Sequence, residues 1–526
     1  MTKPLTESGF SAMCNRMVGV ALAASVIATT VTATWILFSG VPFVRGADLN
    51  VVYTLVKWME GGPLYGSPSA PPFDVAQYGP LYYVIARLVV SVLGGVQLEP
   101  GVVVGISRSV SAVFGAGALA AIALLGIHGF HVDRWTSWAT AAVGLVLTFP
   151  WMVVARPDAL VALLQLLAVA TLCAASTAGV SRTRQTGLFI GAAFIVAAAV
   201  FAKQTAVISI AILGLVAWRE RSLAVALGLM AVSGVVVAGG YGVVGVLWPN
   251  VFENVVTGIN NGVTARDALL KAYPVILLEN AWIPALALIL IARRPGYAFG
   301  ALGALSVSFW LHLVWGVLTA LKDGSAENYF TESILLGLLL AAVSLAQRPD
   351  KGNARGRHAA ALPDLRDVRA LILIVVAASL PLRAIRDFDR YWWSKTAPNS
   401  MLEARRAVPG SPLGGDGHTS RLVRKLQQEL RDNPDRFVLS FDQGVTLALG
   451  SRSLVPQHEV AEVLLDRGLV DYSSLLALGG SGRVYYLVHD GSMWGSFLGL
   501  DLDEYVEAER FGELRLYTRN AEVSAR

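Results

Sequence analysis

Long apolar segments separated by short polar ones make up most of this chain of 526 residues. The first apolar segment runs from Met17 to Phe38 and follows Lys3 and Arg16. It is too long for the core of a signal peptide, so we interpret it as an uncleaved membrane anchor. Further segments long enough to cross a bilayer are predicted at residues 102–127, 136–154, 158–178, 187–202, 204–218, 222–247, 274–292, 297–320, 330–346 and 370–385. Together they predict an α-helical polytopic membrane protein with about eleven spans.

One further apolar segment, residues 81–96, fits a different interpretation. It is barely long enough to cross a bilayer, contains Arg87 in its middle and ends in Gly94-Gly95. The membrane crossings can be counted forwards from a cytoplasmic N-terminus or backwards from the cytoplasmic stretch 348–369. The two counts place the loops on the same sides of the membrane only if this segment does not cross. We therefore expect a juxtamembrane or re-entrant helix on the outer face, because non-spanning elements at membrane depth usually line a cavity.

Basic loop residues orient the predicted spans, since short cytoplasmic loops carry an excess of Lys and Arg. The basic loops are those with Arg182 and Arg184, Arg219 and Arg221, Arg293 and Arg294, and the stretch 348–369. Placing them in the cytoplasm puts a long loop at residues 40–100 outside. The polar junctions at 156–158 and 203–204, and the loops 248–271 and 322–329, then also face outwards.

The alternation of apolar spans stops after Ile385, and the remaining chain has the pattern of a globular domain. Residues 421–431 and 460–465 read as helices, and residues 436–441, 484–488 and 514–518 read as strands. Alternating elements of this kind predict a small α/β domain, which the last crossing leaves outside. We therefore expect a transmembrane domain over residues 1–385 and an extracytoplasmic domain over residues 386–526.

Composition supports the membrane interpretation and excludes other classes. The chain is 55% hydrophobic and 15% charged, whereas a soluble chain carries roughly a quarter charged residues. Its net charge of +5 is spread over short loops, so nucleic acid is not an expected partner. Cys14 and Cys173 cannot form the disulfide framework of an exported domain. We expect a multi-pass protein of the plasma (inner) membrane.

Asp48 is the first candidate for chemistry, because it follows the first span directly in the outer loop. Its position favours two interpretations, which the pattern leaves open. It can cap a helix over residues 49–60, or it can be an acid held at the membrane surface for a lipid-borne substrate. The aromatic residues Tyr78, Tyr82 and Tyr83 close the loop and can line a cleft, although an interfacial aromatic belt gives a similar pattern.

Asp158 and Lys203 lie at two polar junctions on the predicted outer face. Asp158 follows Pro157 at the start of a helix, where both residues are also good structural choices. Lys203 sits between two apolar runs with no turn signal, a costly position unless the ammonium meets an anion or a cavity. Lys203 is therefore the stronger candidate for a functional role.

Three further cations and a polar pair lie in the outer loops. The cations are Arg266, Lys271 and Lys322, and Asn328-Tyr329 follows the last of them. These cations can clamp a phosphate group, or they can be ordinary solvated loop charges.

The order of these motifs resembles the GT-C glycosyltransferases that use polyprenyl-phosphate sugars, the superfamily of lipid A aminoarabinose transferases and protein O-mannosyltransferases. The motifs are Asp48, Tyr78-Gly79-Pro80-Leu81-Tyr82-Tyr83, Arg156-Pro157-Asp158-Ala159-Leu160, Ala202-Lys203-Gln204-Thr205 and Asn328-Tyr329-Phe330. The resemblance covers roughly residues 17–346, and each motif is short. The segment 438–450 also resembles the exported C-terminal domains that such enzymes often carry.

The resemblance implies an inverting glycosyltransferase. Asp48 would be the general base, and Lys203, assisted by Arg266 or Lys271, would stabilise the leaving lipid phosphate, with Lys322 as a further phosphate ligand. Tyr78, Tyr82, Tyr83, Asn328 and Tyr329 would line the substrate cleft. The implied partners are a polyprenyl-phosphate-linked sugar, a glycan, lipid or protein acceptor, and membrane lipid.

Asp158 would be the second outer-loop acid, which in some relatives helps to bind a divalent metal such as Mg or Mn. Many relatives carry two adjacent acids in the first loop, whereas here Asp48 is followed by Leu49 and Asn50. Metal dependence, with Asp48 and Asp158 as the ligands, is therefore left open.

A transporter or flippase of lipid-linked sugars is the alternative from another class. It too needs a cavity, a cation and aromatic loops. Transporters are often built from repeated halves, and the chain has no internal symmetry. A globular tail also suits the handling of an acceptor better than alternating access, so the enzyme is favoured.

Overall fold

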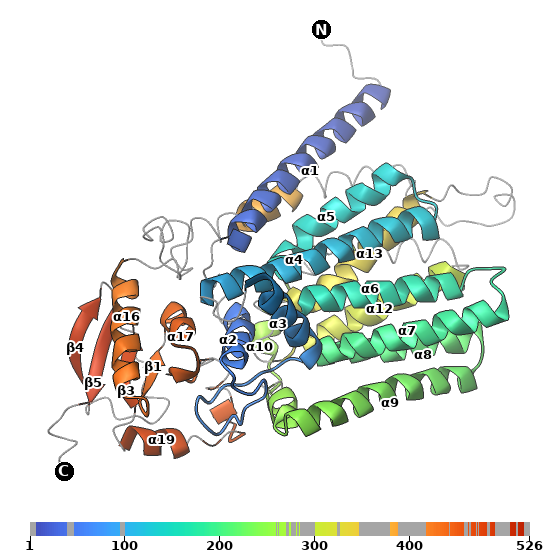
Figure 1. Cartoon of the computed structure of the whole chain (residues 1–526). Coiled ribbons are helices and arrows are strands. Elements are labelled where there is room, and N and C mark those ends of the chain that lie inside the picture. Colours follow the sequence, from blue (N-terminus) through green and yellow to red (C-terminus); the bar gives the residue numbers. More distant parts are fainter. Residues whose placement is uncertain are drawn as a thin grey trace, which may run out of the picture.

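A computed structural model places a helical bundle beside a smaller mixed domain (Figure 1). The structure describes residues 7–38, 47–94, 100–258, 300–322, 327–346, 379–387, 417–440 and 442–456, together with parts of 260–283 and 461–519. The predicted α-helical polytopic membrane protein with a small C-terminal α/β domain is confirmed.

Within the described ranges, eight helical segments are long and apolar enough to cross a membrane. Their helices are α1 (Glu7–Phe38), α4 (Pro100–Leu124), α5 (Arg134–Val153), α6 (Asp158–Ala175), α7 (Arg182–Ala202), α9 (Leu223–Leu247), α12 (Gly300–Thr319) and α13 (Thr331–Ala346). The predicted span 204–218 is a 3-10 turn, η2 (Gln204–Val207), followed by the 13-residue helix α8 (Ile208–Glu220). The predicted spans 274–292 and 370–385 lie largely outside the described residues.

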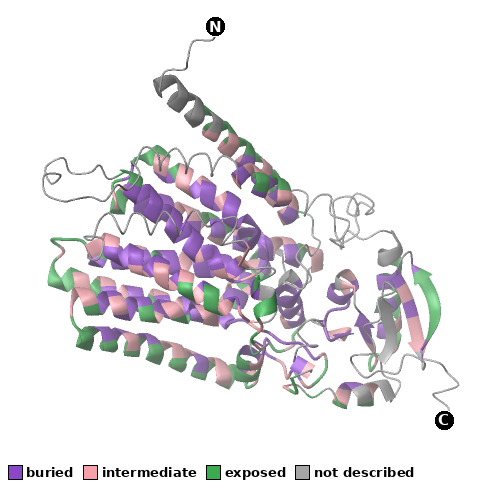
Figure 2. Cartoon of the chain, turned by 180° about the vertical axis from the view of Figure 1, so that it is seen from behind, coloured by how far each residue is buried: buried purple, intermediate pink, exposed green. Residues whose placement is uncertain are grey.

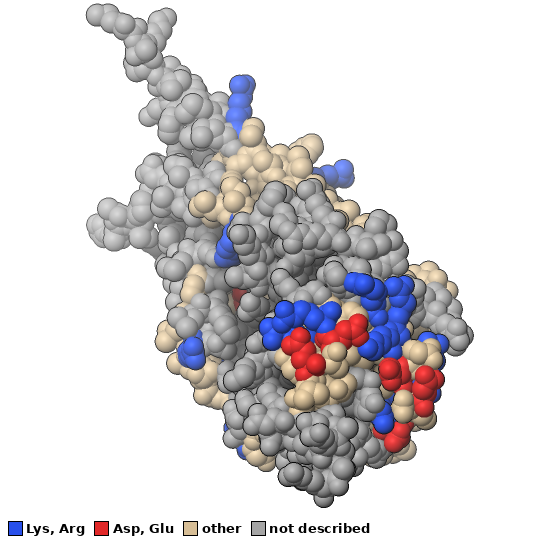
Figure 3. Space-filling model, turned by 90° about the vertical axis from the view of Figure 1, so that its left-hand side faces the viewer, with Lys and Arg blue, Asp and Glu red and all other residues tan. Residues whose placement is uncertain are grey.

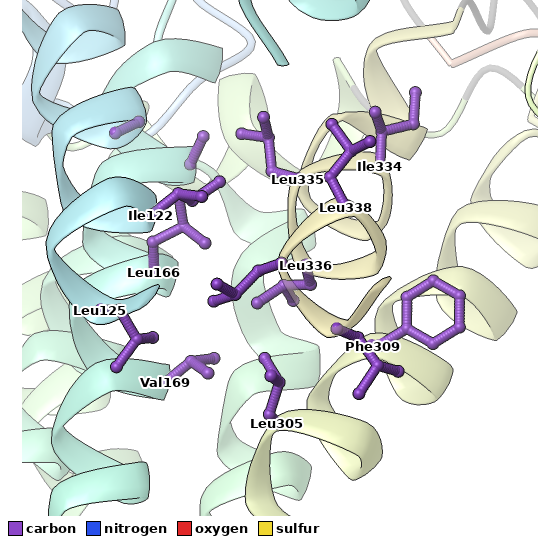
Figure 4. Close-up of a cluster of buried hydrophobic side chains, with 14 of the residues drawn as sticks. Ile122, Leu125, Leu166, Val169, Leu305, Phe309, Ile334, Leu335, Leu336 and Leu338 are labelled. Carbon is purple, nitrogen blue, oxygen red and sulfur yellow. The ribbon is translucent and has the colours of Figure 1, made fainter. Parts of the chain in front are cut away.

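Helix α13 lies at the centre of the bundle. Its span has 78% of its most apolar window buried, against 17% for α9 and 22% for α1. Figure 4 shows Leu335, Leu336 and Leu338 of α13 packed among side chains of α4, α6 and α12. Large side chains on α9 remain exposed, as suits a helix that faces lipid (Figure 2). The first turn of α13 is therefore enclosed by other helices at one end of the bundle.

The two ends of the bundle differ in charge. At one end, Asp133, Ser181 and Ser222 cap helices α5, α7 and α9 through their side chains. Arg134, Arg182 and Arg184 are exposed at this end. At the opposite end, Lys57, Arg156 and Lys203 are buried or nearly so, and each is paired with a carboxylate.

Two shorter helices, α2 (Ala47–Met59) and α3 (Pro80–Gly94), lie at this second end and pack together. Helix α3 is apolar but too short to count as a span, in agreement with the predicted non-spanning segment. The guanidinium carbon of Arg87 lies 4.0 Å from the ring centroid of Trp58 in α2. That cation–π contact accounts for an arginine in the middle of an apolar helix.

The loop between α2 and α3 is fixed by buried polar contacts. The ammonium of Lys57 lies 2.7 Å from the carboxylate of Asp74, and both side chains are almost fully buried. Asn254 accepts from the backbone N–H of Ala76 and donates to the carbonyl of Gly66. The loop therefore has one defined path to Tyr78.

The C-terminal domain is a five-stranded mixed sheet in the order β2-β1-β3-β5-β4. Its elements are α16 (Gly417–Asp432), β1 (Phe437–Ser440), α17 (Gln443–Leu449), η8 (Gly450–Arg452), β2 (Ser453–Leu454), α19 (Ser473–Gly480), β3 (Val484–His489), β4 (Tyr505–Phe511) and β5 (Leu514–Arg519). Strand β1 pairs parallel to β2 and β3, whereas β5 is antiparallel to β3 and β4. The sequence predicted α16, β1, β3 and β5 but missed α17, α19, β2 and β4.

This domain docks on α2 and on the loop after it. Tyr53 donates to the carbonyl of Ser453, and Glu60 accepts from the backbone N–H of Ser451. Ser474 donates to the carbonyl of Ser69. Away from this contact, Figure 3 shows Lys and Arg interspersed with Asp and Glu on the described surface of the domain. Such a mixed charged surface is typical of contact with water.

Candidate functional site

A cluster of buried charges occupies the end of the bundle nearest the C-terminal domain. Asp158 opens α6, and its carboxylate lies 2.7 Å from the ammonium of Lys203 and 3.0 Å from the guanidinium of Arg156. The amide of Asn328 donates to the same carboxylate over 2.7 Å. Asp158 thus accepts hydrogen bonds from Lys203 at the end of α7 and from Asn328 in the turn before α13, and it forms an ion pair with Arg156 in the turn before α6.

Lys203 reaches the cluster because α7 ends there. Its backbone is extended, with φ −157° and ψ 130°, and its N–H still bonds to the carbonyl of Ala199. The chain restarts as η2, which turns Gln204 towards the carbonyl of Gln77 at 2.8 Å. The predicted polar junction is therefore a real break between two helices.

Two aromatic rings flank the cations. The ammonium of Lys203 lies 5.0 Å from the ring centroid of Tyr329 and 5.9 Å from that of Tyr78. Arg156 donates to the hydroxyl of Tyr78 and lies over the ring of Trp151. Burial raises the pKa of Tyr78, although Arg156 and Lys203 oppose the shift, so this phenol stays neutral.

A chain of amides ties the start of α2 to this cluster. Asn50 donates to the side-chain oxygen of Gln77 at 2.9 Å, and Gln77 donates to the carbonyl of Gly258 at 2.6 Å. Gln77 immediately precedes Tyr78, and its carbonyl accepts from Gln204. The first turn of α2, the outer loop and the end of α7 are therefore held in one arrangement.

Asp48 lies in the first turn of α2, which begins at Ala47. The helix expected over residues 49–60 thus starts earlier than expected. Asp48 lies inside its first turn, so it is not the capping residue that precedes the helix. The side chain of Asp48 lies outside the described residues. Its backbone lies two residues from Asn50, whose amide reaches the loop beside Tyr78.

The other sequence candidates divide into two groups. Asn328 and Tyr329 lie in the cluster, as expected. Tyr82 and Tyr83 are fully buried away from it, and the hydroxyl of Tyr82 donates to the carbonyl of Ser107 between α3 and α4. These two tyrosines pack the helices together, and neither lines the pocket described below.

The loop cations also differ in position. Arg266 is exposed in the short helix α10 (Ala265–Asp267), and Lys271 lies outside the described residues. Lys322 is half-buried and pairs through its backbone with Val263. Burial, together with the positive charges of Lys203 and Arg156, lowers the pKa of Lys322 to about 7.

A pocket continues from the cluster into the bundle. Its lining comes from the ends of four helices and the turns beside them: Asp158, Val161, Gln165, Lys203, Thr205, Ile208, His312, Trp315, Thr319, Asn328, Tyr329 and Glu332. The sequence reasoning missed Gln165, His312 and Glu332. Ionisable residues inside apolar segments are rare, so His312 and Glu332 could have been found by that signal.

Solved structures share this architecture, although no protein-family model and no curated protein matches the sequence. ArnT from Cupriavidus metallidurans in the apo state matches with TM-score 0.57 and 14% identity, covering 95% of this chain and 99% of ArnT. The same ArnT bound to undecaprenyl phosphate matches with TM-score 0.54 and 13% identity, covering 99% of each chain. The oligosaccharyltransferase AglB from Archaeoglobus fulgidus, with an inhibitory peptide and a dolichol-phosphate, matches with TM-score 0.52 and 13% identity, covering 97% of this chain and 74% of AglB.

The chain has the GT-C fold. The fold class that the motif order implied is therefore confirmed over nearly the whole chain.

A divalent metal stays an expectation for this site, because the side chain of Asp48, one of the two expected ligands, lies outside the described residues. A structure of the Archaeoglobus oligosaccharyltransferase is a complex with Zn and sulfate. Here the described residues contain no group of three or more His, Cys, Asp or Glu side chains that could hold a metal. One carboxylate oxygen of Asp158 accepts from Lys203 and Asn328, and the other lies 3.0 Å from the guanidinium of Arg156.

Proposed function

We propose that this protein is an integral-membrane glycosyltransferase that moves a sugar from a polyprenyl-phosphate donor to an acceptor hydroxyl. The observation that carries the proposal is the buried cluster of Asp158, Lys203, Arg156 and Asn328 at the docked end of a GT-C bundle. Undecaprenyl phosphate and dolichol-phosphate are bound in structures that share this fold. A lipid phosphate is therefore the ligand that both the fold and the charges of the cluster indicate.

The charge balance at the rim of the cluster suits an anion. Two cations, Lys203 and Arg156, face one carboxylate, that of Asp158. Burial lowers the pKa of Lys322 most, and the positive charges of Lys203 and Arg156 lower it further, so these two charges reach Lys322 as well. A phosphate bound between these three cations would neutralise the excess, as charge-assisted hydrogen bonds require.

In this proposal Asp158 is a positioning residue. One oxygen of its carboxylate accepts from Lys203 and Asn328, and the other forms an ion pair with Arg156 at 3.0 Å. Its role is to hold the ammonium of Lys203 and the guanidinium of Arg156 at the leaving phosphate. Preorganised charges of this kind stabilise a transition state without a reorganisation cost.

Asp48 is the proposed general base. The acceptor oxygen attacks the anomeric carbon while Asp48 takes its proton, and the bond from that carbon to the phosphate oxygen breaks with its electron pair leaving on the phosphate. Attack and departure occur on opposite faces, so the anomeric configuration inverts. The amide chain from Asn50 through Gln77 to Gln204 supports this role, because it ties the turn that carries Asp48 to the phosphate cations.

We place the site on the outer face of the membrane. The cluster, α2 and the C-terminal domain share one end of the bundle, whereas exposed arginines gather at the other. An excess of basic residues in short loops marks the cytoplasmic side.

Binding of undecaprenyl phosphate to purified protein in detergent tests the phosphate site. Lys203→Ala should weaken binding about ten- to a hundredfold, since a hydrogen bond to a charged group contributes roughly 1.5–3 kcal/mol. Lys203→Arg should keep part of the affinity because the charge remains. Lys425→Ala, in an exposed ion pair of the C-terminal domain, is the control.

Thermal unfolding of each variant shows whether a loss of binding is a loss of structure. Wild-type protein that does not bind undecaprenyl phosphate would contradict the proposal. Unchanged affinity in a folded Lys203→Ala variant would remove Lys203 from the phosphate site.

A further inference from the structure

The pocket behind the charge cluster separates two kinds of chemistry along its depth. Its rim carries Lys203 and Asp158, the carboxylate that pairs with Arg156, while its deeper wall carries Gln165, His312 and Glu332. Gln165 is about two helical turns from Asp158 along α6, and Glu332 is one turn beyond Asn328. Among the described residues that line the pocket, Lys203 is the cation, and its charge reaches Glu332.

Gln165 directs an unused acceptor into this space. Its side-chain nitrogen donates to the hydroxyl of Ser209 at 2.9 Å, which assigns the oxygen to the other side of the amide. That oxygen is buried and has no hydrogen-bond partner among the residues that the structure describes, and the side chain is only 3% exposed. Buried polar atoms in folded proteins are nearly always satisfied, so this one calls for a ligand.

His312 presents a second unused atom. Its Nδ1 lies 2.8 Å from the carbonyl of Ser308, and a carbonyl only accepts, so Nδ1 carries the proton. In the neutral ring Nε2 is then an acceptor, and it too is buried with no partner among the described residues. Glu332 also lines the pocket, where its carboxyl group meets its own backbone N–H and the charge of Lys203.

Two buried acceptors without a donor among the described residues, together with the carboxyl group of Glu332 beside them, select a ligand that brings several donors of its own. We propose that this pocket binds the sugar ring of the donor, with its hydroxyl groups donating to Gln165, His312 and Glu332. The indole of Trp315, fixed by its bond to the carbonyl of Thr205, forms an apolar wall beside them. This inference rests on the proposed function and adds the residues that recognise the sugar.

The order of polar groups along the pocket matches the order of groups in a sugar phosphate. The anionic phosphate lies at the rim against Lys203 and Arg156, and the hydroxyl-rich ring points into the bundle. A second phosphate does not suit the depth of the pocket, because its oxygens would meet three acceptors. The residues that recognise the sugar are thus distinct from those that hold the lipid phosphate.

Comparing undecaprenyl phosphate with and without an attached sugar tests the phosphate site and the sugar site separately. Affinity is measured in detergent for undecaprenyl phosphate and for its hexose and pentose conjugates, and the tightest conjugate is used with the variants. Gln165→Leu should lower the affinity for that conjugate about tenfold, which corresponds to 1.4 kcal/mol, and leave sugar-free undecaprenyl phosphate within about twofold. His312→Leu should do the same, and the double variant should lose more.

A thermal-unfolding measurement distinguishes recognition from a structural role. Gln165→Leu and His312→Leu each remove an unused acceptor but also one hydrogen bond, to Ser209 and to the carbonyl of Ser308, so the melting temperature should fall only slightly. Gln185→Leu, which removes a glutamine bonded to the carbonyl of Ala175 at the opposite end of the bundle, is the matched control. It should leave the affinities for both ligands unchanged.

Different results would contradict the sugar pocket and the proposed function. Equal losses for both ligands, or no loss for the conjugate in folded Gln165→Leu and His312→Leu variants, would overturn the sugar pocket. So would wild-type protein that binds undecaprenyl phosphate but no sugar conjugate more tightly. Wild-type protein that binds neither ligand would overturn the proposed function as well.

Discussion

At the scale of single residues, Asp158 is the group on which the candidate site depends. Its single negative charge is shared by two cations, Lys203 and Arg156, that are buried or nearly so. Removing one partner of a buried ion pair leaves an uncompensated charge, which costs more than the pair itself contributes. The cluster is therefore expected to behave as a unit in stability measurements.

Asp158→Asn should destabilise the protein by about 3–5 kcal/mol, because it leaves the charges of Lys203 and Arg156 without their carboxylate. Lys203→Met should cost less, since Asp158 keeps its ion pair with Arg156. The double variant should be less destabilised than the sum of the two, because the pair of Asp158 and Lys203 is then removed as a whole. Chemical unfolding in detergent measures all three. Removing the exposed pair of Lys425 and Glu509 should cost less than about 1 kcal/mol. Strict additivity of the Asp158 and Lys203 variants would show that the two charges do not interact.

Lys322 gives the site a dependence on pH. Its pKa of about 7 means that it is half protonated near neutrality, and only the protonated form attracts a phosphate. A sugar phosphodiester keeps one negative charge from pH 6 to 9, so its binding should weaken as pH rises and Lys322 loses its proton. Because the bound anion favours the charged lysine, the pKa in the complex should lie above that of the free protein.

Titrating donor affinity against pH checks this prediction with two variants. Lys322→Met should bind more weakly at pH 6 and show a flat profile, while Lys322→Arg should stay tight at pH 9. A wild-type slope that persists in Lys322→Met would assign the titration to another group.

The sequence could predict site residues whose position between apolar segments is energetically unfavourable. A lysine between two apolar runs signals an anion, and Lys203 does lie against the carboxylate of Asp158. It could not tell which aromatic residues face the site. Tyr78 and Tyr82 lie four residues apart, but Tyr78 ends the loop and contacts Arg156, whereas Tyr82 bonds to α4. That difference depends on how helices pack, which no local pattern records.

At the scale of elements, the turn before α3 decides where the outer loop meets the bundle. A Cβ atom at Gly79 would overlap the backbone carbonyl of Phe201 at the end of α7. Glycine is therefore required for the loop to approach α7 so closely. This contact brings Tyr78 beside Arg156.

Gly79→Ala should push the loop away from α7 and destabilise the protein by about 1–3 kcal/mol, the range for overpacked sites. Gly234→Ala is the matched control, since its Cβ would meet nothing within 4 Å and alanine favours a helix. Melting temperatures and donor affinities of the two variants provide the comparison. An unchanged melting temperature in Gly79→Ala would mean that the loop can move without cost.

Long periodic elements were predictable, whereas short ones were not. Helices such as α4 and α9 follow from uninterrupted apolar runs, and α16 follows from its amphipathic pattern. Elements such as α17 and β2 are short and are stabilised by contacts distant in sequence, including the bond from Tyr53 to Ser453. Tertiary contacts, rather than local propensity, define such elements.

At the scale of the whole molecule, the two ends of the bundle define its orientation. The end with exposed arginines is proposed to be cytoplasmic, and the end with the cluster and the C-terminal domain is proposed to face outwards. The fold was predictable because short motifs kept their order along the chain. The distances between them were not, since they depend on the breaks at Lys203 and before Asn328.

Single cysteines test this orientation in a background that lacks Cys14 and Cys173. Arg266→Cys lies at the end with the cluster, and Thr183→Cys lies at the opposite end, and both positions are exposed. In intact cells an impermeant thiol reagent should label only Arg266→Cys. Labelling of Thr183→Cys alone would invert the orientation and place the site in the cytoplasm.

The central claim is that the end of the bundle with the charge cluster transfers a sugar from a lipid phosphate, with Asp48 as the base. The most direct measurement incubates purified protein with polyprenyl-phosphate sugars labelled in the sugar and follows release of the label to acceptor or to water. Wild-type protein should release the label, and Asp48→Asn should release it about two to four orders of magnitude more slowly while binding undecaprenyl phosphate normally. Release at the wild-type rate by Asp48→Asn, or no release by wild-type protein with any lipid-linked sugar, would contradict the account.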